Sequence, residues 1–369
     1  MTAQSGTTKA TSAAPLLVRA CHREAVERTP VWFMRQAGRC LVEYRALRER
    51  YGILEIARTP ELCARVTAMP VARLGVDAAV LYADIMLPLD GMGVPFHIEP
   101  DLGPIVEAPV RSRRDVDALR VVAAEEATPY LFETIRRLRR DLAPEVALIG
   151  FAGAPFTLAS YLIEGRPSRD HARAKAMLFG EPELWARLMT TLVEVVSRYL
   201  RAQIQAGVDV VQLFDSWAGS LGPADYERAV LPYTRAIFDR LDLAAGGSGG
   251  SVPRIHFATG NPALTALMGR AGADVVSVDW RLPLDQAWQQ IGDRGIQGNL
   301  DPAVCLAPFP VVAAAARDVL ARVAGRRGHV FNLGHGVLPE TDALVLERLV
   351  ELVREETSSG TAGRSEAAD

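Results

Sequence analysis

Short apolar runs alternate with longer amphipathic stretches along most of this chain. Seven runs have the length and β-branched composition of strands: Asp77–Ala83, Val146–Phe151, Val208–Phe214, Arg254–Ala258, Asp274–Val278, Gly295–Asn299 and His329–Leu333. Several are continuously apolar rather than alternating, as expected for strands that are buried on both faces of a parallel sheet. The pattern therefore predicts a parallel α/β architecture.

The stretches between the runs carry helix-start signals. Thr59-Pro60-Glu61 and Glu181-Pro182-Glu183 each place a proline and an acid in a first helical turn. The repeated strand–helix order fits a (β/α)₈ barrel and also a doubly wound open sheet. No run is followed by the G-x-G-x-x-G fingerprint of a dinucleotide-binding open sheet, which favours a single-domain (β/α)₈ TIM barrel. Its eighth strand is either Val31–Met34 or the stretch near Ile105–Val106.

The barrel domain is predicted to span residues 15–356 of the 369-residue chain, a length at which α/β barrels commonly form one unit. Segments 1–14, an N-terminal extension, and 357–369 contain too few apolar residues to pack, so both are predicted to be disordered tails. Segment 246–251 consists of glycine and serine and is predicted to be a flexible surface loop.

Composition narrows the class of protein. The chain is 49% hydrophobic and 23% charged with a net charge of −3, which does not indicate nucleic acid or a membrane surface as a partner. The four cysteines are scattered without C-x-x-C spacing, which argues against a disulfide framework or a zinc site. Neither a secretory signal nor an apolar run of about 18 residues is present. We therefore expect a cytoplasmic protein.

Polar and small residues follow the predicted strands, at the edge where barrel enzymes place their chemistry. These positions are Asp84, Gly153-Ala154, Asp215-Ser216, Thr259-Gly260, Asp279, Asn299 and Gly334-His335. The only lysines, Lys9 and Lys175, lie in a tail and in a predicted helix, which argues against Schiff-base chemistry. No H-E-x-x-H, G-x-S-x-G or P-loop motif is present, so no cofactor or metal is indicated.

Arginines supply the positive candidates. Arg35 and Arg39 stand four apart around a glycine, and Arg45 and Arg48 follow. A guanidinium binds a carboxylate in a bidentate manner and stays charged at any cellular pH. The alternative is a solvated helix face with Arg–Glu pairs at helical spacing. The apolar segment Val31–Met34 directly before Arg35 favours a binding site, because the arginines then leave a buried element.

Five motifs together resemble the uroporphyrinogen decarboxylase family. They are Pro30–Arg39 with Glu43-Tyr44-Arg45, Tyr82–Ile85, Gly150–Gly165, Gln212–Gly219 and Phe331–Gly336. They occur in the family's order and cover roughly residues 15–355. The chain departs from the family at Cys40-Leu41-Val42, where tyrosine, leucine and proline are usual, and segment 246–251 resembles an insertion.

The resemblance implies stepwise removal of CO₂ from the four acetate side chains of uroporphyrinogen III, which gives coproporphyrinogen III in haem and other tetrapyrrole biosynthesis. Decarboxylation needs an electron sink. A pyrrole that is protonated on the ring carbon next to the acetate becomes a cationic sink, so the substrate supplies its own and no cofactor or metal is expected. The resemblance also implies a homodimer.

The resemblance also assigns site residues. Asp84, Arg35 and Arg39 would be catalytic, and the substrate would be bound by Arg35, Gln36, Ala37, Gly38, Arg39, Arg48, Asp84, Tyr161, Ser216 and His335. Asp84 would accept hydrogen bonds from the pyrrole N–H groups and favour the pyrrolic cation. Gln36, Ala37 and Gly38 would contribute backbone N–H groups.

Each of these residues also has an ordinary structural interpretation. Asp84 could cap a helix after its strand, and Ser216 could do the same. Tyr161 could be a partly buried aromatic residue. His335, between two glycines, could be a turn residue, although its position after the last strand supports a site.

Two other functions are compatible with the same architecture. A corrinoid-dependent methyltransferase would need zinc held by a histidine, a cysteine two residues later and a distant cysteine. The matching place here reads His256-Phe257-Ala258, with alanine where a thiolate is required, and Cys305 alone cannot complete the site. A non-catalytic tetrapyrrole binder would keep the arginines but would not need Asp84.

Overall fold

The computed structural model describes residues 14–99, 102–241 and 251–358. Nearly all of the two predicted tails and of the predicted loop 246–251 therefore lies outside the described residues. The predicted start of the C-terminal tail was wrong by a residue. Helix α16 (Ala343–Thr357) extends to Thr357, whose hydroxyl oxygen accepts a hydrogen bond from the N–H of Thr29 at 3.0 Å.

Seven parallel strands form the central sheet. They are β1 (Ala78–Val80), β4 (Ala147–Gly153), β5 (Val210–Asp215), β6 (Arg254–Ala258), β7 (Val275–Ser277), β8 (Gly295–Leu300) and β9 (His329–Leu333). Their order in the sheet is β1-β4-β5-β6-β7-β8-β9. Each predicted run overlaps one of these strands, which confirms the prediction of a parallel α/β fold. Every residue of β4, β8 and β9 is buried, including the polar residues Gln297 and Asn299 of β8 and His329 and Asn332 of β9.

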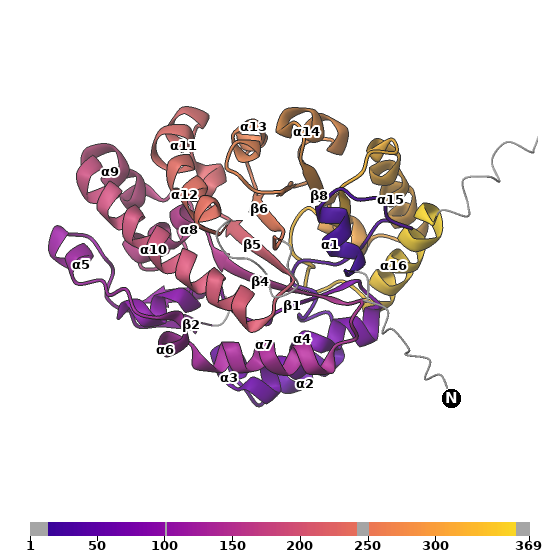
Figure 1. The fold of residues 1–369 in the computed structure, drawn as a ribbon, viewed down its shortest axis with the longest axis horizontal. Coiled ribbons are helices and arrows are strands. Elements are labelled where there is room, and N and C mark those ends of the chain that lie inside the picture. Colours follow the sequence, from indigo (N-terminus) through magenta and orange to yellow (C-terminus); the bar gives the residue numbers. More distant parts are fainter. Residues whose placement is uncertain (1–13, 100–101, 242–250, 359–369) are drawn as a thin grey trace, which may run out of the picture.

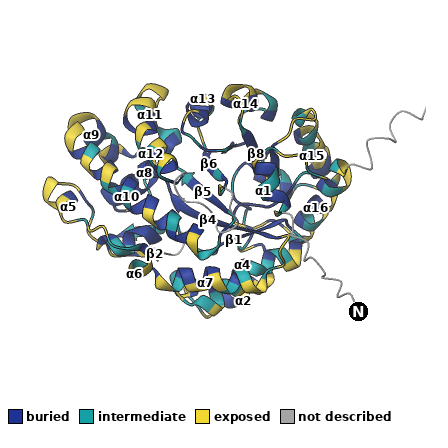
Figure 2. Cartoon of the chain, in the orientation of Figure 1, coloured by how far each residue is buried: buried dark blue, intermediate teal, exposed yellow. Residues whose placement is uncertain are grey.

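Helices surround the curled sheet (Figure 1) and turn their buried sides towards it (Figure 2). Besides α16 they are α1 (Leu16–Cys21), α2 (Val42–Arg48), α3 (Ile53–Arg58), α4 (Pro60–Leu74), α5 (Arg113–Asp117), α6 (Ala124–Ala127), α7 (Pro129–Asp141), α8 (Pro155–Glu164), α9 (Ala172–Gly180), α10 (Pro182–Ala206), α11 (Pro223–Ala229), α12 (Leu231–Leu241), α13 (Thr265–Gly269), α14 (Leu284–Ile291) and α15 (Phe309–Val323), with short 3₁₀ turns η1 (Leu87–Met92), η2 (Ala218–Ser220), η3 (Pro262–Leu264) and η4 (Pro302–Leu306). The starts of α4 and α10 at prolines confirm both predicted helix starts.

The segment around Val31 is bonded to both edge strands of the sheet. Val31 forms a parallel bridge with Phe331 of β9. The N–H of Trp32 donates to the Phe331 carbonyl at 3.3 Å. On the other side, the N–H of Asp77, directly before β1, donates to the Val31 carbonyl at 2.9 Å.

The other candidate for an eighth strand lies elsewhere. Ile105 and Val106 belong to β3 (Gly103–Val106), which pairs antiparallel with β2 (Phe96–Glu99) in a separate two-stranded sheet. Assigning Ile105–Val106 to the parallel sheet was therefore wrong. Sequence analysis did not predict this hairpin.

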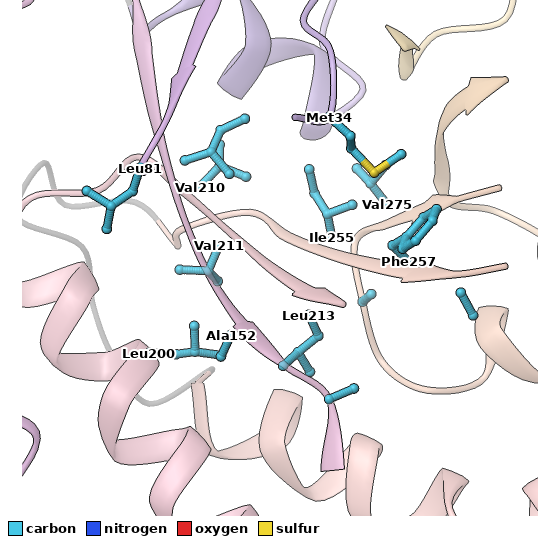
Figure 3. Packing of buried hydrophobic residues seen from close by; sticks show 14 of the residues in the cluster. Met34, Leu81, Ala152, Leu200, Val210, Val211, Leu213, Ile255, Phe257 and Val275 are labelled. Carbon is cyan, nitrogen blue, oxygen red and sulfur yellow. The ribbon is translucent and has the colours of Figure 1, made fainter. Parts of the chain in front are cut away.

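The hydrophobic core lies within the sheet and between the sheet and the helices. Figure 3 shows part of it, including Ile255 and Phe257 of β6 and Met34 from the segment before Arg35. Because Met34 is 3% exposed, it anchors the chain in the core just before the first candidate arginine. Burial of this segment thus determines where Arg35 emerges.

Candidate active site

The candidate residues come from segments that follow parallel strands. Asp84 follows β1, Tyr161 lies on α8 after β4, Ser216 follows β5 and His335 follows β9. Since all strands of a parallel sheet end at one edge, these segments meet at what we call the carboxyl edge. The segment that bonds both edge strands delivers Arg35 to the same edge.

The side chain of Arg35 lies directly over Gly336. A Cβ atom at position 336 would stand 2.4 Å from Cδ of Arg35, so any larger residue would displace the arginine. The backbone of Arg35 has a φ of 59°, a left-handed conformation that is uncommon for a residue with a side chain. The loop after β9 and the loop after Val31 therefore fit together through this contact.

Gln36 has a structural role that differs from the predicted one. Its side chain is 1% exposed; Oε1 accepts from the N–H of Phe33 at 3.0 Å and Nε2 donates to the Ala78 carbonyl at 2.9 Å. Its backbone N–H donates to the Phe33 carbonyl at 3.1 Å. The turn thus already uses this N–H, and its role in substrate binding stays a prediction. The N–H groups of Ala37 and Gly38 have no hydrogen bond within the described ranges, and their role stays a prediction.

Asp84 makes the cap-like contact that was one of the two roles weighed for it. Its Oδ1 accepts from the N–H of Met86 at 2.8 Å, a cap-like contact just before η1. Its Oδ2 has no hydrogen bond to any residue in the described part of the chain. Burial raises the pKa of this carboxyl group, while the hydrogen bond from Met86 and the nearby Arg35 charge oppose the rise. One carboxylate oxygen is thus left for a ligand.

Tyr161 is a buried phenol beside Asp84. Its side chain is 7% exposed, and its ring lies edge-on to Trp217 at 5.8 Å between centroids. Burial, and next the charge of Asp84, raise the pKa of Tyr161 to about 12. The group therefore remains a neutral hydrogen-bond donor at neutral pH.

His335 is a neutral imidazole with a defined tautomer. Its Nδ1 accepts from the N–H of Gly336 at 2.7 Å, which leaves the ring proton on Nε2. Burial, and next the charge of Arg35, lower the pKa of His335 to about 4. Its ring lies edge-on to Phe257 at 5.9 Å. His335 is therefore suited to donate one neutral hydrogen bond.

One guanidinium connects these groups. The charge of Arg35 acts on the pKa of Asp84, of Tyr161 and of His335. The structure thus brings together four of the predicted site residues, which came from four separate parts of the chain. The set holds one cation, one anion and two neutral donors, which suits a ligand that carries carboxylates and N–H groups.

The contacts of three other predicted residues point to other neighbours. Arg48 donates to the Tyr51 carbonyl, and its charge acts on the pKa of Tyr82. The Tyr82 hydroxyl is hydrogen-bonded to the hydroxyl of Tyr44 on α2. Arg39 is exposed, and its carbonyl accepts from Arg45. Ser216 is half-buried in the turn after β5. Their participation in binding stays a prediction.

Sequence analysis overlooked Arg281. Asp279 was predicted as a strand-end residue, but the arginine two positions later was not. The charge of Arg281 also acts on the pKa of His335. The available signal was position: Arg281 follows β7 as closely as Asp84 follows β1.

The described residues contain no group of three or more His, Cys, Asp or Glu that could hold a metal ion. His256 is fully buried, and its ring lies edge-on to Phe238 of α12 at 5.8 Å. Burial lowers the pKa of His256 to about 4. The geometry around His256-Phe257-Ala258 thus gives no support to a zinc-dependent methyltransferase.

Comparison with known proteins identifies the family of this chain. The family model described as Uroporphyrinogen decarboxylase (URO-D) matches residues 12–356. The chain belongs to the uroporphyrinogen decarboxylase family. A family member from Salinispora tropica is 52% identical over 346 residues, covering 94% of this chain and 91% of its own length. One from Thermus thermophilus is 51% identical, covering 92% and 97%. Both are named uroporphyrinogen decarboxylase.

Solved structures of other proteins share the fold of this decarboxylase family member. A methyltransferase from Methanosarcina mazei superposes with a TM-score of 0.76 at 19% identity, covering 92% of this chain and 97% of its own. A B12-independent methionine synthase from Shewanella superposes with a TM-score of 0.54 at 13% identity, covering 83% and 90%. At such identities only the architecture is shared. In the described ranges, every helix is too short or too polar to cross a bilayer.

Proposed function

We propose that this chain is a uroporphyrinogen decarboxylase, which removes CO₂ stepwise from the four acetate side chains of uroporphyrinogen III and yields coproporphyrinogen III. The observation that carries the proposal is the convergence of Arg35, Asp84, Tyr161 and His335 at the carboxyl edge of a chain that belongs to this family. The relatives' shared name supports the same reaction.

The chemistry that we propose needs only the substrate and these side chains. Protonation of the pyrrole carbon next to an acetate creates a cation, and the electrons of the breaking C–C bond neutralise it as CO₂ leaves. A proton then adds to the resulting methylene carbon and the ring carbon loses its extra proton, which gives the methyl group and restores the pyrrole. The open oxygen of Asp84 accepts from pyrrole N–H groups and its charge stabilises the cation. Arg35 and Arg39 bind acetate or propionate carboxylates. The Tyr161 hydroxyl and His335 Nε2–H donate to further carboxylates.

The direct test uses protein that has been stripped of metal with a chelator. It is incubated with uroporphyrinogen III, and the carboxylates on the products are counted by mass spectrometry. We expect successive seven-, six-, five- and four-carboxylate products. Absence of CO₂ loss, or activity that returns only with stoichiometric zinc, would contradict the proposal.

Asp84→Asn separates an enzyme from a tetrapyrrole carrier. The amide keeps an oxygen for Met86 but removes the charge that stabilises the cation, so we expect the turnover rate to fall about 100-fold or more. Binding of the oxidised substrate analogue uroporphyrin, measured by calorimetry, should change by only a few-fold. Unchanged turnover would favour the carrier. The matched control Asp170→Asn changes an exposed aspartate and should behave as the parent protein.

We further propose that Val31–Met34 completes a closed (β/α)₈ barrel in one domain of residues 15–356. The bonds of the Val31 segment to both β9 and β1 support this closure. We also propose that the protein works in the cytoplasm and as a homodimer. Analytical ultracentrifugation tests the dimer, and a single species at about 40 kDa would contradict it.

A further inference from the structure

A second guanidinium stands at the carboxyl edge, held by Asp279. The Asp279 side chain is 6% exposed; its Oδ2 accepts from the Thr259 hydroxyl at 2.9 Å and from the Gly260 N–H at 2.7 Å. The same carboxylate binds Arg281 twice: Oδ1 accepts its backbone N–H at 2.9 Å and Oδ2 accepts Nη1–H at 2.7 Å. Asp279 thus fixes both the backbone and the side chain of Arg281.

Trp280 supports the same guanidinium from another side. The Arg281 Cζ atom lies 4.3 Å from the centre of the Trp280 ring, within cation–π range. The arginine side chain is nevertheless 44% exposed. Of the guanidinium nitrogens, only Nη1 has a hydrogen bond to a described residue. The remaining N–H groups are therefore free for a ligand. Because Asp279 and Trp280 already hold the side chain, ligand binding needs to order it less.

A single turn connects Arg281 with Arg35. A Cβ atom at Gly334 would stand 2.7 Å from the Trp280 backbone nitrogen, so this glycine packs directly on the residue before Arg281. Two positions later, Gly336 packs under Arg35. His335 lies between the two glycines, and the charges of both arginines act on its pKa. Two guanidinium groups thus flank one neutral histidine.

An ordinary surface ion pair does not account for this arrangement. Asp279 already accepts three hydrogen bonds without the guanidinium: from Thr259, Gly260 and the backbone of Arg281. A half-exposed ion pair adds at most a small stabilisation. The fixed orientation and the free N–H groups are what a carboxylate-binding position needs.

We propose that Arg281 binds a carboxylate side chain of the tetrapyrrole substrate, as a second anchor beside Arg35 at the turn Gly334–Gly336. The inference deepens the proposed function and rests on it. It assigns a substrate-positioning role to a residue that takes no part in the cation chemistry at Asp84. Its loss should therefore weaken binding more than it slows the reaction.

The test compares Arg281→Gln and Arg281→Lys with the parent protein and a matched control. Arg322→Gln is the control, because Arg322 lies on α15, is bonded to Asp318 and Asp285, and is 35% exposed. We measure kcat and KM for uroporphyrinogen III, the Kd of uroporphyrin by calorimetry, and the melting temperature.

We expect Arg281→Gln to raise KM and the uroporphyrin Kd roughly five- to thirtyfold, with kcat within about threefold. Arg281→Lys should give an intermediate rise, since lysine keeps the charge but loses the fork. Arg322→Gln should leave all values unchanged. The proposal is overturned if Arg281→Gln keeps KM and Kd within twofold, or if the control loses affinity equally.

Folding and function are kept apart in this design. If Arg281→Gln does not fold, Arg281→Lys decides: a threefold or larger rise in Kd at an unchanged melting temperature supports the anchor, and a parental Kd overturns it. If the parent protein binds uroporphyrin but removes no CO₂, the proposed function alone fails. The Kd comparison still tests Arg281 as a carboxylate-binding residue.

Discussion

Arg35 adopts a left-handed backbone conformation, which costs a residue with a side chain roughly 1 kcal/mol. The buried side chain of Gln36 offsets this cost, because its two hydrogen bonds hold the turn against Phe33 and Ala78. The direction of the guanidinium is then set by Gly336, over which it lies. One candidate catalytic side chain thus depends on two residues that need not touch the substrate.

Gly336→Ala tests this dependence. The added methyl group would stand 2.4 Å from the Arg35 side chain, whose flexible end can move, so we expect the unfolding free energy to change by less than about 1 kcal/mol. The displaced guanidinium should lower kcat/KM for uroporphyrinogen III about tenfold or more. Gly180→Ala is the control, because a methyl group there meets nothing within 4 Å. A parental kcat/KM in Gly336→Ala would show that the position of Arg35 is unimportant.

Among the elements, strands were predictable where several consecutive residues are apolar. All seven runs overlap a strand because burial on both faces leaves a strong local pattern. The Val31 segment remained ambiguous because it forms a single bridge and not a ladder. The hairpin β2–β3 was missed because its burial is mixed, and mixed patterns resemble loops.

The side-chain partners within the site were less predictable. Gln36 binds the carbonyl of Ala78, 42 positions away, and no local pattern indicates such a pairing. Asp84 and His335 were first singled out by their positions after predicted strands, whereas Tyr161, and the roles of all three residues, came from the family resemblance. Arg281 was overlooked because the sequence does not show that Asp279, a predicted strand-end residue, forms an ion pair with it.

The junction of the Val31 segment with β1 makes a prediction at this scale. The Asp77 carboxylate is 7% exposed and accepts from the Val31 N–H at 2.8 Å and from both terminal nitrogens of Arg28 at 2.8 and 2.5 Å. Asp77→Ala leaves the buried Val31 N–H without its partner and removes the carboxylate that pairs with the partly buried Arg28 cation. We expect a loss of about 2–4 kcal/mol in unfolding free energy, measured by urea denaturation.

The control for this variant is Asp293→Ala. Asp293 pairs with Arg23, but its side chain is 90% exposed, so its removal should change the unfolding free energy by less than about 0.5 kcal/mol. Equal effects of the two substitutions would mean that the carboxylate of Asp77 does not secure the junction.

Across the whole molecule, buried histidines make stability depend on pH. Burial lowers the pKa of His256, His329 and His335 to about 4, below the ordinary value of 6.5. Between these values the unfolded chain binds more protons than the folded one. Each histidine therefore costs stability as pH falls from about 6.5 towards 4.

His256→Leu isolates one of these contributions. Among the described residues, neither ring nitrogen of His256 makes a well-formed hydrogen bond, and the ring has only a weak contact with the Met268 backbone, so leucine removes a titrating group at little cost in bonding. From pH 7 to pH 5 the parent should lose about 1–2 kcal/mol more unfolding free energy than the variant.

The buried Asp215 carboxyl, with its pKa raised to about 7 by burial, acts in the opposite direction but equally in both proteins. His22→Asn, at an exposed position, is the control. Parallel pH curves for His256→Leu and its parent would contradict the assignment.

The bond between Thr29 and Thr357 has a consequence for how the chain can be cut and rejoined. It joins the end of α16 to the segment just before Val31. Ala14 and Arg354 line the same groove. Neighbouring ends are the condition under which circular permutation succeeds. A permuted gene that links residue 358 to residue 14 and opens the turn between α15 and β9 would keep every strand beside its present neighbours. Such a protein should fold with its catalytic edge unchanged.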